Sequence, residues 1–232
     1  MKSLSSVGGQ PGEIVLAELM TSHGPLTDAR AVSEERITPR IGHVPDLLID
    51  LWRLYGVGAL RDGGLWLAMP GDFDRVTELV FGGDADLGTG TQLIAYGAMG
   101  NFLCWNSRYG AVLVSPASGA VQAPALTQRA PALDHDALLL SYLQELHPFF
   151  FDRVDRDNQP MLDRARAAWG PLSYGQIYAA YPIQDVGEGI GVENVAIDDA
   201  VDYLTEVARV TGFMLQDFEN NRFNIRDIGS PK

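Results

Sequence analysis

The sequence has very little cysteine and no long apolar run. Cys104 is the only cysteine among 232 residues, so no disulfide can form within the chain. The apolar stretches fall far short of the ~20 residues that a membrane-spanning helix needs. The first 13 residues, MKSLSSVGGQPGE, lack the apolar segment of a secretory signal peptide. Together these absences predict a protein of the reducing cytoplasm.

Basic side chains are scarce as well. The chain carries 17 Lys and Arg residues against 30 Asp and Glu residues, which gives a formal net charge of -13. No Lys or Arg occurs between Ala167 and Ala208. Because phosphate binding needs a basic face, this composition argues against nucleic acid as a direct ligand. An acidic surface of this kind either keeps a protein soluble or docks a cationic partner.

Recognisable catalytic and metal-binding patterns are missing too. The sequence has no G-x-S-x-G or H-E-x-x-H motif, and none of its four histidines pairs with another at the i, i+4 spacing of a helical zinc site. Cys104 lies in an apolar stretch, which favours a buried, inert thiol over a nucleophile. We therefore expect no catalytic residues, no cofactor and no structural metal, although a triad dispersed along the chain remains open.

Three loops deserve comparison with known ligand-binding loops. The glycines of GEGIGVE, residues 187–193, resemble a phosphate-binding loop, but Glu188 would repel phosphate and a strand is predicted to follow. DRDNQP, with Asp155, and GDADLG, with Asp84, begin like calcium loops but lack the closing carboxylate. We expect all three to be ordinary loops, with weak calcium binding left open.

Hydrophobic residues make up 46% of the chain and charged residues 20%, so the chain can bury a core. The segment VQAPALTQRAPALD, residues 121–134, has two prolines and little periodicity, and we expect it to separate two modules. We divide the chain into a loose N-terminus (1–12), a first module (13–125), a second module (133–215) and a C-terminal tail (216–232).

Periodicity predicts the elements of each module. In the first module we expect helices over 13–20, 44–55 and 72–81, and strands over 65–69, 92–96, 101–105, 111–115 and 120–122. In the second we expect helices over 136–147 and 161–169, a final helix that is capped by Asp198 or Asp199 and ends before Gly212, and strands over 175–183 and 191–197. The predicted fold is α+β: mixed helices and a small antiparallel sheet, one form of which is SMI1/KNR4-like, packed on a smaller, mainly helical α+β module.

Acidic and aromatic residues of the second module are the candidates for contact with a partner. Most aromatic side chains, including Trp52, Tyr55, Trp66 and Trp105, fall in predicted elements and are expected in the core. Exposed aromatic residues beside acids suit a protein interface. The predicted partner-binding residues are Asp185, Glu188, Glu193, Asp198, Asp199, Asp202, Tyr174, Tyr178 and Tyr181.

The chain also resembles a known family. VPDLLIDLWRLYGVGALRDGGLWLAMPGDFD resembles the opening of the GAD-like domain, and MGNFLCWNSRYGAVLVSPASGAV resembles its later hairpin. WGPLSYGQIYAAYPI and GVENVAIDDAVDYLTEVARV resemble the C-terminal domain that accompanies it in immunity proteins of type VI secretion DNase toxins. The resemblance covers roughly residues 40 to 212 and supplies no contact residues to carry over.

The resemblance implies a cytoplasmic immunity protein, an antitoxin that binds its cognate DNase effector one to one and neutralises it without turnover. Since a DNase needs a basic surface to hold DNA, an acidic partner agrees with that function. Two alternatives stay open: an intracellular adaptor with another protein partner, and a small enzyme that acts on a nucleotide or a cationic substrate.

Overall fold

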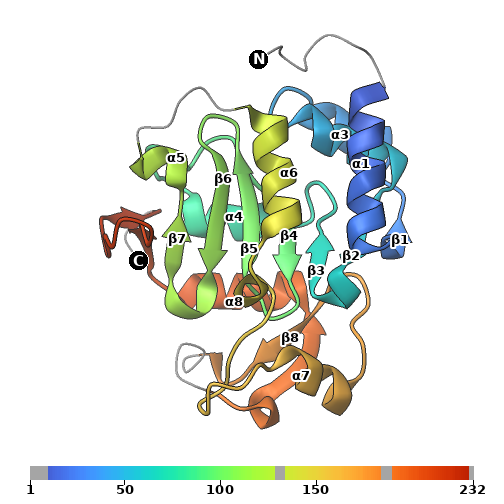
Figure 1. The fold of residues 1–232 in the computed structure, drawn as a ribbon. Helices are drawn as coiled ribbons and strands as arrows, with labels where there is room; N and C mark the ends of the chain where they lie inside the picture. Colours follow the sequence, from blue (N-terminus) through green and yellow to red (C-terminus); the bar gives the residue numbers. More distant parts are fainter. Residues whose placement is uncertain (1–9, 129–133, 184–189, 230–232) are drawn as a thin grey trace.

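The computed structural model describes residues 10–128, 134–183 and 190–229. Its centre is a nine-stranded sheet with the strand order β1-β2-β3-β4-β5-β6-β7-β10-β11 (Figure 1). Neighbouring strands are antiparallel except β7 and β10, which run parallel. Its strands are β1 Thr27–Arg30, β2 Val57–Leu60, β3 Leu65–Leu67, β4 Thr91–Gly97, β5 Phe102–Asn106, β6 Gly110–Ser115, β7 Ala120–Gln122, β10 Phe213–Gln216 and β11 Asp227–Ile228.

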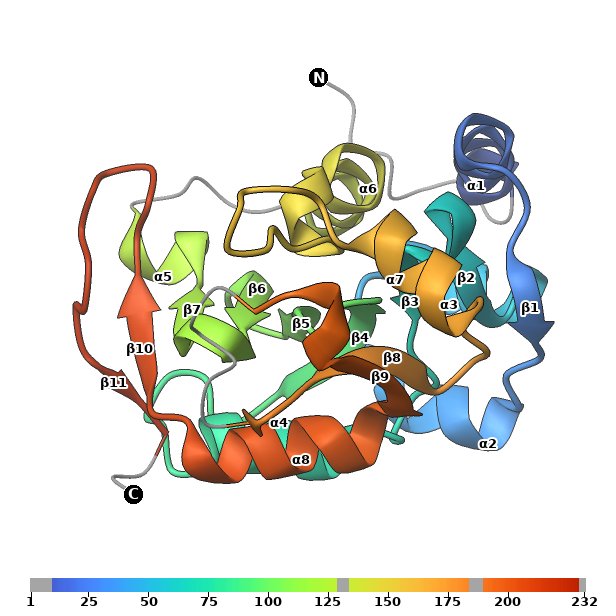
Figure 2. The same cartoon turned by 90° about the horizontal axis from the view of Figure 1, so that it is seen from below.

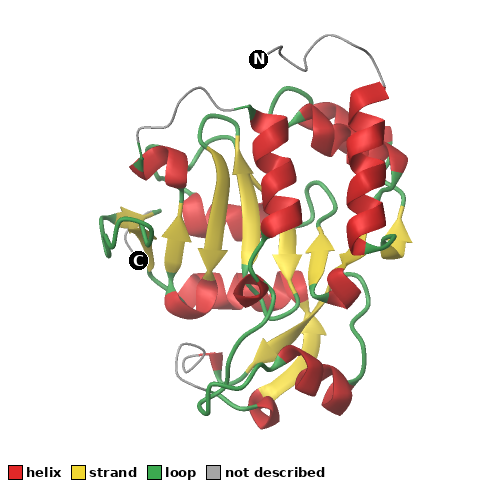
Figure 3. Cartoon of the chain, viewed as in Figure 1, coloured by secondary structure: helices red, strands yellow, loops and turns green. Residues whose placement is uncertain are grey.

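Helices cover both faces of this sheet (Figure 3). On one face lie α1, α3 and α6, and on the other lie α4 and α8, which pack against each other (Figure 2). A separate antiparallel pair, β8 and β9, packs with α7 beside the sheet. The bounds are α1 Gln10–His23, α2 Glu34–Ile37, α3 Asp46–Leu54, α4 Asp74–Phe81, α5 Pro124–Thr127, α6 His135–Glu145, α7 Leu162–Trp169, β8 Gln176–Ala180, β9 Val195–Asp199 and α8 Ala200–Val210.

The central strands are apolar because both of their faces are buried. In β5, Phe102 and Cys104 face the core beneath α4 and α8, whereas Leu103 and Trp105 face the core beneath α3 and α6. This alternation is the two-residue period of a strand. The predicted core tryptophans are confirmed, since Trp52, Trp66 and Trp105 are at most 1% exposed; Tyr55 is half-buried.

Local signals placed most helices and several strands correctly. The helix expected after His43 is α3, and Gly56 ends it with a left-handed φ of 78°. The Gly56 N–H donates to the carbonyls of Leu51 and Trp52, as in a glycine-terminated helix. The predicted helices over 72–81, 136–147 and 161–169 are confirmed as α4, α6 and α7, with ends that differ by one to two residues.

The expected small sheet of the first module is wrong. The sheet has nine strands, and the last two, β10 and β11, come from the C-terminal part of the chain. Strands β1 and β2 were missed because all four residues of β1 are exposed and show no alternation, and β2 contains Gly58. The parallel pairing of β7 with β10 joins Ala120 to Met214, a contact that no local pattern encodes.

Candidate functional site

The acidic surface predicted from the sequence lies where β9 passes directly into α8. Asp199 ends the strand and caps the helix: its side chain accepts hydrogen bonds from the backbone N–H groups of Val201 and Asp202, at 2.9 and 3.0 Å. Aspartate suits this position because its carboxylate satisfies free N–H groups and the positive end of the helix dipole. The junction therefore holds Asp199 in a fixed orientation at the surface.

The neighbouring Asp198 is tied to an exposed aromatic side chain. Its carboxylate accepts hydrogen bonds from the Asp199 N–H, at 2.8 Å, and from the phenolic hydroxyl of Tyr181. Tyr181 is 37% exposed, and its ring packs edge-on against Tyr203 at 5.7 Å. Burial and the adjacent Asp198 carboxylate raise the pKa of Tyr181 to about 12, so this hydroxyl remains a hydrogen-bond donor at neutral pH.

Three carboxylates at this junction form no ion pair with any residue that the structure describes. Within the described part of the chain, Asp198, Asp199 and Asp202 form no ion pair, whereas Glu193 pairs with Arg156 and Glu206 pairs with Arg209. Asp199 and Asp202 are exposed and Asp198 is half-buried. We call Tyr181, Asp198, Asp199 and Asp202 the acidic junction. One of its three carboxylates, Asp198, contacts the partly exposed ring of Tyr181 through the phenolic hydroxyl.

Two of the predicted anchors have structural roles instead. Tyr178 is 2% exposed because both faces of β8 are buried, and its hydroxyl donates to the Gly170 carbonyl at 2.6 Å. The hydroxyl of Tyr174 accepts a hydrogen bond from the Met69 N–H at 2.6 Å, and the Arg30 guanidinium lies 4.6 Å from the centre of its ring. Of the three tyrosines, Tyr181 therefore offers the most usable surface.

The remaining predicted residues separate into two groups. Glu193 lies in the short turn before β9 and pairs with Arg156. Asp185 and Glu188 lie outside the described residues. The described end of the glycine-rich stretch is followed by the short 3-10 turn Val192–Asn194 and then by β9, so the strand expected over 191–197 begins four residues later than predicted. A dinucleotide-binding turn would open a helix there instead.

In the two calcium-like loops, the carboxylates of Asp155 and Asp84 form hydrogen bonds and ion pairs with other groups of the protein. Asp155 accepts hydrogen bonds from the N–H groups of Asp157 and Gln159, and it pairs with Arg164. Asp84 accepts N–H donors in the same way and pairs with Arg226. Among the residues with described placement, no group of three or more His, Cys, Asp or Glu side chains is arranged to hold a metal ion.

Sequence reasoning missed an exposed aromatic cluster near the C-terminus. Residues 216–232 were expected to be a tail, but β10 and β11 form a hairpin that carries Phe218, Phe223 and Ile225 at its surface. The rings of Phe218 and Phe223 lie 5.7 Å apart. The alternation of Phe223 and Ile225 after an Asn-Asn pair was the available signal.

Comparison with known proteins gives a family for part of the chain and a fold for nearly all of it. Residues 14–116 match the family model of the GAD-like domain. The crystal structure of Atu4351 from Agrobacterium tumefaciens is similar, with a TM-score of 0.85, 24% sequence identity and coverage of 92% of this chain and 97% of that chain. No match was found among curated proteins. At this identity the similarity shows the fold alone.

In the described part of the chain, no helix has the length and apolar character needed to cross a membrane. The longest helix, α1, has 14 residues and contains Glu13 and Glu18.

Proposed function

We propose that this chain, which contains a GAD-like domain at residues 14–116, is an immunity protein that binds a cognate type VI secretion DNase effector in the cytoplasm and neutralises it. It acts by stoichiometric binding, without turnover. The observation that carries this proposal is the acidic junction, where three carboxylates form no ion pair among the described residues and one of them, Asp198, accepts a hydrogen bond from the partly exposed Tyr181.

The chemistry of the expected partner matches this surface. A DNase holds its substrate with Lys and Arg side chains, and the same side chains can pair with carboxylates of an inhibitor. Opposite charge also speeds and orients the encounter. An exposed ion pair contributes only ~0–1 kcal/mol, so tight inhibition needs a buried anchor as well. Tyr181 has the polar tip and apolar body typical of such an anchor.

The resemblance of the C-terminal half supports the same function. WGPLSYGQIYAAYPI and GVENVAIDDAVDYLTEVARV span β8, β9 and α8, the elements that build the acidic junction. These two stretches resemble the domain that accompanies the GAD-like domain in immunity proteins. The proposed contact surface therefore lies in the part of the chain that carries this resemblance.

Co-expression with the nuclease encoded beside this chain's gene tests the proposal. We expect cells that make both proteins to survive and cells that make the nuclease alone to die. Equal death with and without this chain would overturn the proposal. The variant D198N/D199N/D202N should protect less well, because it removes three charges while Asn still caps α8. The matched control E18Q/E35Q/D157N removes three charges from exposed residues elsewhere and should protect like the wild type.

A further inference from the structure

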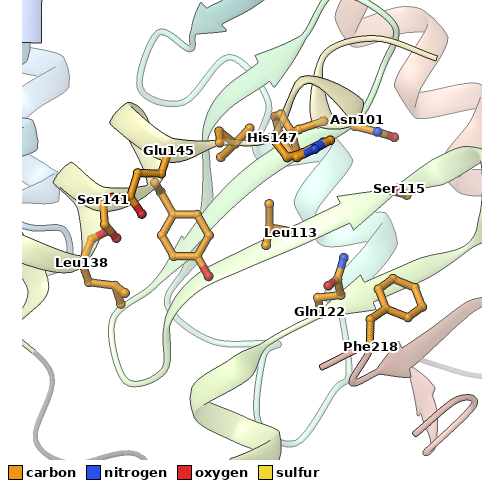
Figure 4. A pocket seen from close by; sticks show the side chains of 12 residues that line it. Asn101, Leu113, Ser115, Gln122, Leu138, Ser141, Glu145, His147 and Phe218 are labelled. Carbon is orange, nitrogen blue, oxygen red and sulfur yellow. The ribbon is translucent and has the colours of Figure 1, made fainter. Parts of the chain in front are cut away.

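A cavity lies on the sheet face opposite α8. It is an open groove of about 680 Å³ between α6 and the β10–β11 hairpin. Figure 4 shows Leu138, Ser141 and Glu145 along one side, Leu113 and Gln122 on the strands of the floor, and Phe218 on the other side. The acidic junction does not line this groove.

The floor of the groove is the part of the sheet that the helices leave uncovered. Val112, Val114 and Val121 point into the core on the α4 and α8 side. The alternate residues of β6 and β7, Leu113, Ser115 and Gln122, therefore point into the groove, where they are half-buried. A mixture of apolar and polar side chains suits a surface that is wet in the free protein and covered in a complex.

The hairpin places Phe218 in the groove wall, and the ring of Phe223 packs against it. Phe218 and Phe223 are 46% and 59% exposed. Asp217 holds the turn between them: its buried carboxylate accepts hydrogen bonds from Asn220 and from the guanidinium of Arg222. Because the backbone is fixed in this way, the two rings are exposed without the entropy cost of ordering a loose loop on binding. Exposed, ordered aromatic rings are typical binding hot spots.

The rim of the groove is negatively charged. None of the described residues that line it is Lys or Arg, and Glu145 lies at the end of α6. On the hairpin, Glu219 accepts a hydrogen bond from the side chain of Gln128. Burial raises the pKa of Tyr142 in the groove wall, and the Glu219 carboxylate adds to this effect. Glu219 directly follows Phe218, which lines the groove, so it stands on the hairpin side of the groove.

We propose that this groove docks an amphipathic α-helix of the partner protein, with an apolar face toward Leu113 and Phe218 and with Lys or Arg side chains toward Glu145 and Glu219. Helices pack about 8–10 Å apart and strands lie about 4.8 Å apart, so the next helix position beside α6 falls over β7. The 11 residues of α6 extend for about 16 Å. A partner helix that lies alongside α6 over this length would have about three turns.

A partner helix fits this surface better than a second copy of the chain does. The formal net charge of -13 and the acidic rim oppose self-association through this face. The inference rests on the proposed function for the identity of the partner. It adds a second contact surface on the opposite face of the sheet, so the two surfaces can be tested separately.

The test uses the full chain and the nuclease encoded beside its gene. We expect F218A/F223A to raise the Kd of the complex about tenfold or more, as for hot-spot residues. V210A, which truncates a 60% exposed apolar residue outside the groove, should leave the Kd unchanged. A photo-crosslinking phenylalanine analogue at Gln122 should capture a nuclease peptide with apolar residues at helical spacing and flanking Lys or Arg.

Each other outcome has a distinct meaning. Wild-type Kd values for F218A/F223A, together with no crosslink from Gln122, would overturn the groove while leaving the proposed function intact. Crosslinks to a second copy of this chain would overturn the choice of occupant. If the wild-type chain forms no complex with the nuclease, the proposed function itself fails.

Discussion

The guanidinium of Arg226 holds the buried carboxylate of Asp84 through two hydrogen bonds, from Nη1 to Oδ2 at 2.5 Å and from Nη2 to Oδ1 at 3.2 Å. Arg226 directly precedes β11, whereas Asp84 lies in the turn after α4. The pair therefore fastens the last strand of the sheet to the GAD-like domain.

This pair predicts an acid-dependent loss of stability. Burial acts to raise the pKa of Asp84, but the hydrogen bonds from Arg226, Leu87 and Asp86 outweigh it and hold the pKa at about 2. Because the pKa of Asp84 is lower in the folded chain than in the unfolded chain, the ionised carboxylate stabilises the fold. This contribution is complete above about pH 4 and is lost as the pH falls toward about 2. We expect D84N to lose about 2 kcal/mol of unfolding free energy at pH 7 in urea titrations.

The control for this experiment is D227N, which makes the same change at an exposed aspartate of β11. It should unfold like the wild type. The prediction fails if D84N and D227N have the same unfolding free energy, or if D84N keeps the wild-type loss of stability between pH 4 and pH 2.

The parallel contact between β7 and β10 depends on a glycine. Gly119 has a φ of 65°, and a Cβ atom there would lie 2.2 Å from the Gly212 carbonyl oxygen. G119A should therefore lower the unfolding free energy by about 1–3 kcal/mol, measured by urea or thermal unfolding. Gly212 supplies the matched control, because a Cβ atom there meets nothing within 4 Å. Equal effects of G119A and G212A would contradict this account of the strand contact.

The cap of α8 allows stability and charge to be separated at Asp199. D199A removes the acceptor for Val201 and Asp202 and should cost about 1 kcal/mol of unfolding free energy. D199N keeps an acceptor there and should unfold like the wild type. Because D199N still removes the charge, its association with the basic partner should be slower at low salt and converge with the wild type at high salt. Identical association kinetics at low salt would place the interface elsewhere.

Cys104 should behave as an inert core residue. The side chain is 0% exposed, and burial raises the pKa of its thiol well above the ordinary value. Since the thiolate is the reactive form, a disulfide-exchange reagent should label the native protein only as fast as the chain unfolds. Labelling should become rapid and complete in denaturant. Fast labelling of the native protein would contradict the burial of Cys104.

The sequence predicts the elements with strong local patterns and misses those defined by distant contacts. The apolar spacing of α3 and the terminal Gly56 are sufficient to place that helix. The number of strands in the sheet was underestimated because β10 is recognised only through its pairing with β7, about 90 residues earlier in the chain. Local periodicity carries no information about such a partner.

The candidate site was predictable in part for a similar reason. Asp198 or Asp199 was predicted to cap α8, and the hydrogen bonds from the N–H groups of Val201 and Asp202 show that Asp199 is the cap. The burial of Tyr178 was not predictable, because it depends on β8 having a core on each side: Ile177 joins one cluster and Tyr178 the other. The groove beside α6 depends on three segments that meet only in the folded chain.

Titration of DNA cleavage by the neighbouring nuclease with this purified protein tests the central claim most directly. With the nuclease well above the Kd of the complex, we expect cleavage to fall linearly and stop at one equivalent of the protein. The D198N/D199N/D202N variant should need a larger excess, and E18Q/E35Q/D157N should match the wild type. Undiminished cleavage at a large excess of the wild-type protein would contradict the account, and so would complete inhibition at a small fraction of one equivalent.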